Sequence, residues 1–297
     1  MTARAHRDVV SRPGRPIRSE PHGVSGRGAL IVLYLILAFF TVVMLGPILW
    51  LVASSFKTNA EILSGSWFVP EQVNFEGFAD AFAEGDLNRV FVNSLINSVS
   101  TTVLVLTIAS LAAYVLARHE FPFSRLLTAA FSLGIVVPIT SMIVPVSYVV
   151  RRIGLFDSRP GLILVYTAIY FPISFLIMRA YFMNIPKEIE QAAYVDGAGL
   201  FTVLRRVALP LSTPGLATVA VIVFVFSWNE FLYALILTSS PELRTAQIAL
   251  RFFTSQFDFN LPAMFATVTI VMAVPIVVFI ALQERVISGL TAGATKQ

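Results

Sequence analysis

The sequence predicts an all-α membrane protein with six transmembrane helices, and three observations support this prediction. Hydrophobic residues make up 57% of the 297 residues and charged residues only 13%, whereas soluble domains have about 45–50% and about 25%. The mean hydropathy is +0.80, which is too apolar for a surface that meets only water. The apolar residues also gather in six long stretches. Lipid must therefore form part of the solvent of this chain.

Each of the six stretches is long enough, or nearly so, to cross a hydrocarbon core of about 30 Å, which takes about 20 helical residues. The first is too long for the core of a signal peptide and lacks a small-residue cleavage site after it, so we expect it to remain as a span. Together the stretches define a membrane domain over residues 29–288, followed by a cytoplasmic tail over residues 289–297. The six stretches are Ala29–Phe56, Phe91–Ala117, Leu126–Val150, Gly161–Met183, Gly215–Thr238 and Pro262–Leu282.

The basic residues of the loops set the expected orientation. Fourteen Lys and Arg fall on the side of the two termini and seven on the other side, so both termini are expected in the cytoplasm. Arg151, Arg152 and Arg159 run against this rule because they cluster in an external loop. Residues 1–28 are rich in Arg, Ser, Gly and Pro without an apolar period, which predicts a disordered, basic cytoplasmic tail that meets anionic lipid.

Composition also excludes several kinds of site. The chain has no cysteine, so it has no disulfide framework, thiol nucleophile or thiolate metal site. Its three histidines, His6, His22 and His119, lie near charged or flexible segments, and we expect neither a metal site nor a catalytic residue. The net charge of +4 comes mainly from the basic N-terminus beside a span. Nucleic acid is therefore not an expected partner.

The loop between the fourth and fifth stretches, residues 184–210, predicts two short helices. Pro186 suits a first helical position, and Glu188 and Glu190 fall in the first turn, where the helix dipole favours anions. Gly197 can adopt the left-handed conformation that ends a helix.

A second helix is expected over Phe201–Val207, with Pro210 as its stop. Ala192 and Ala193 leave one face of the first helix small enough for another surface to approach closely. A helix, a glycine and a second helix between two spans suit docking in a groove on a soluble partner.

This loop also carries a family resemblance. It contains the run Gln191-Ala-Ala-Tyr-Val-Asp196-Gly197-Ala198, followed by Val207-Ala-Leu209-Pro210. The run resembles the EAA loop of the permeases of binding-protein-dependent ABC importers. The family usually has Glu where this chain has Gln191, and Glu190 lies one position earlier, so either side chain could make the charged contact to the partner.

Other segments are similar to the second permease subunit of carbohydrate importers of the maltose and trehalose type. The likeness extends from about residue 30 to the end. The matching segments are Asn93-Ser-Leu-Ile-Asn-Ser98, Gly154-Leu-Phe-Asp157 with Gly161-Leu-Ile-Leu164, Trp228-Asn-Glu-Phe231 and Gly289-Leu-Thr-Ala-Gly-Ala294.

The resemblance implies the type I ABC importer permease fold in a bacterial inner membrane, with this chain forming half of a pathway for a di- or oligosaccharide. It implies a second permease subunit, two ATPase subunits and an extracytoplasmic sugar-binding protein as partners. The segment 289–297 would reach the ATPase interface, and the external loop 239–262 would probe the binding protein. The residues implied to couple to the ATPase are Glu188, Glu190, Gln191, Ala192, Ala193, Asp196, Gly197, Ala198, Leu209 and Pro210.

The positions of the lysines indicate that any ATPase is on a separate chain. A P-loop needs a lysine directly after a glycine, and the three lysines, Lys57, Lys187 and Lys296, follow other residues. ATP and Mg²⁺ are therefore expected on a partner, and no cofactor is expected on this chain.

Candidate substrate contacts begin with Trp228, Asn229 and Glu230. Glu230 is the only acid placed within a predicted span, where a charge costs about 2.5–3.5 kcal/mol at the bilayer centre and is by default functional. Aromatic rings stack on sugars, while amides and carboxylates bond hydroxyl groups. The alternative is an interfacial acid bonded to a neighbouring span, and tryptophan also favours membrane interfaces.

Asn93 and Asn97 share one face of the second stretch with Ser100 and Thr101. They are further candidates for the substrate pathway, and the alternative is interhelical hydrogen bonding worth about 0.6 kcal/mol per contact. In the third stretch, Pro138 and Pro145 break the helical hydrogen bonds, as happens where a cavity is lined.

Two other functions are weighed against an ABC permease. A self-contained secondary transporter or channel would need acid–base pairs inside the membrane, and the sequence offers one acid without a basic partner. A membrane-embedded enzyme would need His, Asp or Cys clustered at membrane depth, and the sequence has none.

Overall fold

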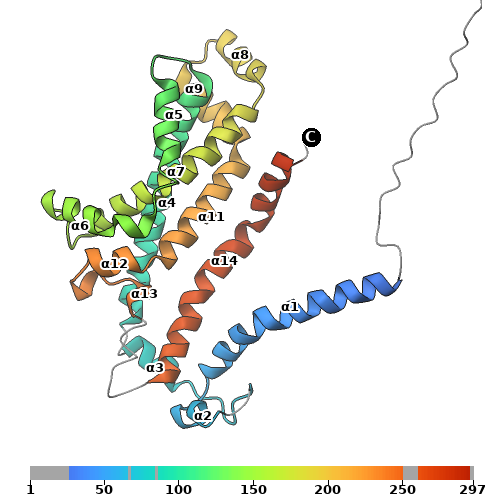
Figure 1. The fold of residues 1–297 in the computed structure, drawn as a ribbon, viewed down its shortest axis with the longest axis vertical. Helices are drawn as coiled ribbons and strands as arrows, with labels where there is room; N and C mark the ends of the chain where they lie inside the picture. Colours follow the sequence, from blue (N-terminus) through green and yellow to red (C-terminus); the bar gives the residue numbers. More distant parts are fainter. Residues whose placement is uncertain (1–26, 66–67, 84–85, 250–259, 295–297) are drawn as a thin grey trace, which may run out of the picture. The chain divides into compact units, whose positions relative to one another are not determined.

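The computed structural model describes residues 27–65, 68–83, 86–249 and 260–294, and side chains are described as far as residue 283. Every regular element in these ranges is a helix (Figure 1). The all-α prediction is therefore confirmed for the described residues. The predicted basic tail lies outside them except for its last two residues, as do residues 250–259 of the external loop and the final three residues.

Helix α1 (Arg27–Ser54) forms the predicted first span. The chain divides into two units after Leu49, so most of α1 belongs to the first unit and is described by itself. Its apolar side chains are exposed on all sides, including Phe39, Met44 and Leu49. A helix that is apolar all round belongs in lipid or in a core, so lipid accounts for this exposure.

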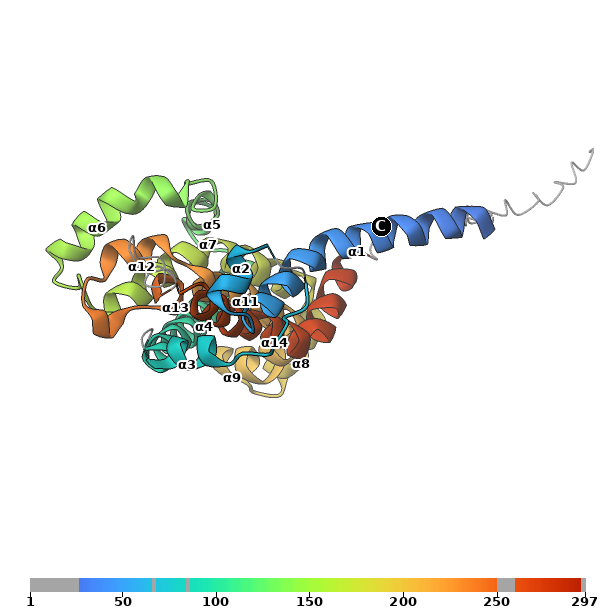
Figure 2. The ribbon, with the colours of Figure 1, turned by 90° about the horizontal axis from the view of Figure 1, so that it is seen from below.

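The second unit is built around α4 (Leu87–Arg118), which packs against α7 (Arg159–Asn184) and α11 (Thr213–Asn229). Helix α11 also packs against α14 (Leu261–Ala294), and the bundle is seen from below in Figure 2. On α4, Ala109 and Ala113 are fully buried one turn apart. Within a membrane the hydrophobic effect does not drive helices together, because lipid tails are themselves apolar. Helices associate there by close packing, which small residues at the contact permit.

The number of spans is the point where the structure differs from the prediction. Four of the described helices are long and apolar enough to cross a membrane, and there are five if one bent pair counts as a span. That pair is Leu200–Leu211 with Thr213–Asn229, bent by 77°. The count of six spanning helices is therefore not confirmed.

The third predicted stretch is not one helix. It forms α5 (Ser124–Leu133), a short 3₁₀ turn η1 (Ile139–Met142) and α6 (Ile143–Arg152). Ten residues reach only about 15 Å, half of the hydrocarbon core. The chain packs closely on α7 at this break, since a Cβ on Gly134 would lie 2.6 Å from the ring of Pro172. Pro138 follows the break and cannot donate a helical hydrogen bond.

The fifth predicted stretch is also divided, into α11 and the short α12 (Leu232–Leu237), with the break at Glu230 and Phe231. The sixth corresponds to α14, which continues to Ala294 through most of the predicted tail.

The remaining short elements are α2 (Asn59–Leu63), α3 (Glu76–Ala83), α8 (Lys187–Val195), α9 (Leu200–Val203), the π turn η2 (Leu204–Ala208), α10 (Leu209–Leu211), the 3₁₀ turn η3 (Pro241–Leu243) and α13 (Ala246–Ala249).

The three arginines that oppose the positive-inside rule all have partners within the fold. Arg151 lies 3.3 Å above the ring of Phe156, and Arg152 donates to the hydroxyl of Tyr148 at 3.0 Å. Arg159 donates to the Oδ1 atom of Asn93 at 2.7 Å. The bond from Arg159 to Asn93 joins α7 to α4, whereas the other two contacts are local to α6 and the loop after it.

Gly77 tests the packing of α3 against α14. A Cβ added there would lie 2.7 Å from the backbone carbon of Pro262, which cannot move aside. We expect Gly77→Ala to lower the stability by about 1–3 kcal/mol through overpacking. Thermal unfolding in detergent measures this, with Gly46→Ala as the control because no atom lies within 4 Å of that position. Equal midpoints for the two variants would contradict the packing.

Candidate functional site

The loop between α7 and α11 forms two helical segments, as predicted. Helix α8 begins at Lys187, one residue later than expected, because Pro186 has an extended ψ of 131° and precedes the helix. Glu188 and Glu190 lie in the first turn, as predicted. Gly197 has a φ of +84°, which confirms the predicted left-handed end of the helix.

Two hydrogen bonds close the end of α8 in a Schellman arrangement. The N–H of Gly197 donates to the carbonyl of Tyr194, and the N–H of Ala198 donates to the carbonyl of Ala193, both at 3.0 Å. The turn into α9 is therefore fixed by the backbone and needs a residue that tolerates a positive φ.

The second segment is longer than predicted. It runs from Leu200 through α9, η2 and α10 to Leu211, so the helix continues one residue past Pro210. Proline has no N–H and its ring clashes with the carbonyl four residues earlier. The wider π turn before Pro210 gives the chain room to pass it. The chain then bends by 77° into α11.

A buried ion pair attaches α8 to the end of α4. The Nε of Arg118 lies 2.8 Å from the Oε1 of Glu190, and the two side chains are only 5% and 7% exposed. Tyr114 donates to the other carboxylate oxygen at 3.1 Å, and Arg118 also donates to the carbonyl of Ile185 at 2.8 Å. With these extra bonds the geometry is good enough to offset the desolvation of both charges.

This pair distinguishes the two candidates for the charged contact by their burial. Glu190 points into its own chain, whereas Gln191 next to it is exposed. The carboxylate of Glu190 is thus occupied within the chain in this conformation, and which of the two residues contacts a partner stays a prediction.

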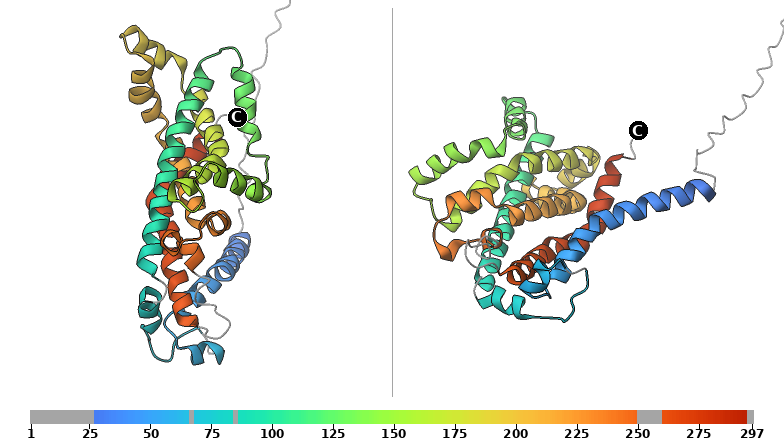
Figure 3. Two further views of the ribbon diagram at one scale, coloured as in Figure 1. Left: turned by 90° about the vertical axis from the view of Figure 1, so that its left-hand side faces the viewer. Right: turned by 60° about the horizontal axis from the view of Figure 1, so that its bottom comes forward.

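The other predicted coupling residues surround an exposed tip, which we define as residues 191–201 (Figure 3, left). The tip presents apolar side chains to solvent, since Val195 is 87% and Phe201 68% exposed. Exposed apolar groups gathered in this way mark an interaction surface. Among the predicted residues, Glu188, Gln191, Ala192, Asp196, Gly197 and Pro210 are exposed, and Ala193, Ala198 and Leu209 are half-buried.

Asn93 is occupied by contacts within the chain. Its Nδ2 donates to the carbonyls of Glu242 at 2.7 Å and Arg244 at 3.0 Å, and its Oδ1 accepts from Arg159. These bonds fix the loop at η3 to α4, in line with the alternative of hydrogen bonding between elements. Asn97 is also buried, and its Oδ1 has no partner within the described residues.

Trp228 is packed in the second core of the bundle. It is 1% exposed, its indole N–H donates to the carbonyl of Val271 at 3.1 Å, and its ring packs on Phe224 and Phe91. The ring therefore has no face open to a sugar in this conformation, which corrects the expectation that it stacks on substrate.

Glu230 lies in the break between α11 and α12, and its carboxylate caps the second helix. It accepts from the N–H groups of Tyr233 at 2.7 Å and Ala234 at 3.0 Å, and from the hydroxyl of Tyr166 at 2.7 Å. The first N–H groups of a helix need such acceptors. The bond to Tyr166 of α7 matches the alternative of an acid bonded to a neighbouring span, and a substrate role stays a prediction.

Asn229 is the exposed member of this group. Its Nδ2 donates to the carbonyl of Val225 at 2.9 Å, and its Oδ1 accepts from Gln247 at 3.2 Å. Gln247 was not predicted, because only the fold brings α13 to the end of α11 and nothing in the local sequence marks it. The two amides offer hydrogen-bonding groups at the surface.

Asp157 holds the start of the external loop. Its carboxylate accepts from the N–H groups of Ser239 at 2.7 Å and Ser240 at 3.0 Å and from the hydroxyl of Ser240. These bonds, first among them that from the Ser240 hydroxyl, hold the pKa of the Asp157 carboxyl below its usual value. The loop is thus fixed at Asp157 as well as at Asn93.

Metal binding finds no support in the part of the chain that the structure describes. No group of three His, Cys, Asp or Glu there could hold a metal ion.

Comparison with known proteins identifies the family. The model of the binding-protein-dependent transport system inner membrane component matches residues 106–291. The chain belongs to this family. It is a permease subunit of such a transport system, as the EAA-type loop predicted. The secondary transporter and the membrane enzyme find no support.

The similarity to individual relatives covers most of this permease. It is 40% identical to the trehalose transport system permease protein SugB of Mycobacterium tuberculosis, over 84% of this chain and 92% of the relative. It is 32% identical to the diacetylchitobiose uptake system permease protein NgcG of Streptomyces coelicolor, over 91% and 90%. A bacterial ABC transporter structure for alginate import has a TM-score of 0.80 at 22% identity, covering 90% of this chain and 99% of that one. The ABC permease fold is therefore confirmed.

Glu190→Ala tests the attachment of α8 in the permease. The change leaves the Arg118 guanidinium buried without its counter-ion, which costs about 3–5 kcal/mol for such a pair. We expect a lower thermal midpoint and faster amide hydrogen exchange in α8. The control is Gln191→Ala, one position along and exposed, which should change neither quantity. Equal effects of the two changes would show that the pair does not hold α8.

Proposed function

We propose that this permease forms half of the pathway of an ATP-driven importer for a di- or oligosaccharide in a bacterial inner membrane. The observation that carries the proposal is the exposed tip, held by the buried pair of Arg118 and Glu190. The sugar is supported by relatives named for trehalose, diacetylchitobiose and melibiose, raffinose and stachyose import.

The tip is proposed to dock in a cleft on an ATPase subunit, which binds the ATP and Mg²⁺. Two connections would carry its movement into the membrane. One is the Arg118–Glu190 pair from α8 to α4, and the other is the helical segment that bends by 77° into α11. Because α4 and α11 also pack on each other, a shift of the tip tilts them together. Two ATPases closing on ATP would draw together this tip and that of a second permease subunit.

The orientation follows from charge. The end of the bundle that carries α8 is proposed to face the cytoplasm, together with both termini, because fourteen of the Lys and Arg fall on that side and seven on the other. The opposite end carries the loop that Asn93 and Asp157 fix. A sugar-binding protein is proposed to deliver its ligand there, to a loop that is already held in place.

The substrate pathway is proposed to use amides. Asn229 is exposed and Gln247 half-buried, and their amides are paired, so each keeps hydrogen-bonding capacity for sugar hydroxyls. Asn93, Asn97 and Glu230 lie behind them as supporting groups, and Trp228 packs α11 on α14.

Reconstitution in liposomes tests the proposal. The liposomes contain this permease, its second permease subunit and the ATPase, and a sugar-binding protein is added. They should take up sugar only when ATP is on the ATPase side of the membrane and the loaded binding protein is on the other side. Uptake by this chain alone without ATP would refute the proposal.

Gly197→Val tests the tip as the coupling element. A β-branched residue is strained at a φ of +84°, so the tip changes shape while the spans do not. We expect ATP hydrolysis to continue and uptake to fall by about tenfold, equivalent to about 1.4 kcal/mol of lost coupling. Gly197→Asn is the control, because Asn tolerates the left-handed region, and it should keep most uptake. Unchanged uptake in the valine variant would count against the coupling role.

Asn229→Ala and Glu230→Ala separate substrate contact from helix capping. We expect Asn229→Ala to raise the sugar concentration for half-maximal uptake by about tenfold at an unchanged thermal midpoint, since one hydrogen bond to a hydroxyl contributes about 0.5–1.5 kcal/mol. Glu230→Ala should lower the midpoint because α12 loses its cap. Wild-type transport kinetics in Asn229→Ala would remove it from the pathway.

A further inference from the structure

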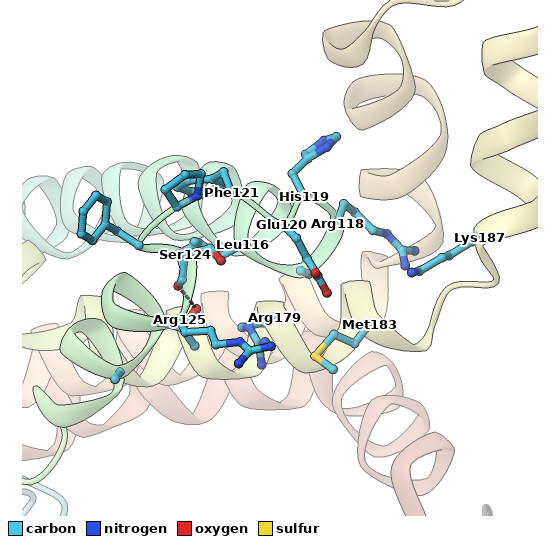
Figure 4. A pocket seen from close by; sticks show the side chains of 15 residues that line it. Leu116, Arg118, His119, Glu120, Phe121, Ser124, Arg125, Arg179, Met183 and Lys187 are labelled. Carbon is cyan, nitrogen blue, oxygen red and sulfur yellow. Dashed lines mark hydrogen bonds between the residues drawn. The ribbon is translucent and has the colours of Figure 1, made fainter.

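A cavity of about 910 Å³ lies at the same end of the bundle as α8. It is formed where α4 ends, α5 begins, α7 ends and α8 starts, and Figure 4 shows the side chains that line it. It is separate from the exposed tip, since Lys187, the first residue of α8, is the only residue of α8 in its lining. Of its lining residues, only Arg118 takes part in the proposed coupling, through its pair with Glu190.

The cavity has an excess of positive charge. Arg118, Arg125, Arg179 and Lys187 line it, with Glu120 as the one carboxylate in the lining. Arg118 is neutralised by Glu190, which leaves three cations against one acid, a net charge of +2. Within the described residues, the side chains of these three cations have no ion pair or hydrogen bond. Glu120 forms no ion pair with them.

Two of the cations share one part of the cavity without an anion. Arg125 and Arg179 both line the cavity, and Figure 4 shows their guanidinium groups pointing toward the same part of it. The Nε of Arg179 is buried and has no hydrogen-bond partner within the described residues. A buried donor of a charged group without an acceptor costs more than a neutral one, and like charges that line one cavity repel each other. An anionic ligand between them would remove both costs.

The chemistry of the cations selects phosphate. Two guanidinium groups present planar forks that match phosphate oxygens, and a lysine adds a point charge. The rim of the cavity is apolar: Phe121 and Phe123 are 38% and 73% exposed, and Met183 is 54% exposed. Leu126, in the first turn of α5 beside the cavity, is 64% exposed. A ligand with a phosphate and an apolar chain fits both parts.

We propose that this cavity binds the headgroup of an anionic phospholipid, with its phosphate on Arg125 and Arg179 and its acyl chains along α5. The cavity lies where the membrane helices α4 and α7 end, which is the depth of lipid headgroups, and basic pockets between membrane helices bind such headgroups. Lys187 belongs to the cavity and begins α8, so the lipid contacts the element that Arg118 also holds. The proposal requires only that the chain is embedded in a membrane, and it stands or falls separately from the sugar and the ATPase.

The test uses the full chain, co-purified with its transport subunits, in nanodiscs of phosphatidylcholine with a small fraction of labelled phosphatidylglycerol. The measurement is the affinity for the labelled lipid. The variant is the pair Arg125→Gln with Arg179→Gln. The matched control is Arg205→Gln with Arg206→Gln, which removes two exposed charges at the same end but outside the cavity.

We expect about 30-fold weaker binding of phosphatidylglycerol in the cavity variant and little change in the control, since each basic residue contributes about fivefold. Thermal unfolding of each variant checks the fold. If the double variant does not fold, Lys187→Gln at an exposed position takes its place, with an expected loss of about fivefold.

Three results would overturn the proposal. Equal losses in the cavity and control variants would indicate general attraction to a charged membrane. Displacement of the labelled lipid by millimolar inorganic phosphate would indicate a site for a free anion. Unchanged lipid affinity with loss of a co-purified subunit would indicate that the cavity receives an acidic segment of a protein partner.

Discussion

The buried contact between Arg118 and Glu190 is the interaction on which the position of α8 depends. It lies where α4 ends, so its charges are shielded from water and are strong only because Tyr114 and the carbonyl of Ile185 complete their hydrogen bonds. Removing one partner of such a pair is costly, because the other charge is left buried without a counter-ion. The pair attaches α8 to the end of α4 and so helps to position the exposed tip.

The breaks in the membrane helices follow a common rule: freed backbone groups at membrane depth must find partners inside the protein. At the break after α11, the Glu230 carboxylate takes the first N–H groups of α12. In the loop outside the membrane, the π turn η2 precedes Pro210. The acid and the prolines are therefore part of how the chain bends, which also explains why a lone acid is tolerated within an apolar stretch.

Much of the fold was predictable because it depends on local properties. The lengths of the apolar stretches predicted α1, α4, α7 and α14. The residues typical of helix ends predicted the two-helix loop with Gly197 between its helices. The division of the third predicted stretch was harder to predict. Gly134 and Pro138 permit a break in the helix, but the close packing of Gly134 on Pro172 is visible only in the fold. Roles of single polar residues were the least predictable, because Trp228 and Asn93 depend on which elements surround them.

By itself, the sequence determined that this chain is embedded in a membrane, presents an EAA-type loop and lacks a P-loop. These properties follow from composition and from residues that are adjacent in the chain. Only the tertiary structure decided that Glu190 faces inward and Gln191 outward, that Asn229 meets Gln247, and that Arg125 and Arg179 line one cavity. These depend on the rotation of each helix about its axis and on contacts between residues far apart in sequence, and packing alone sets both.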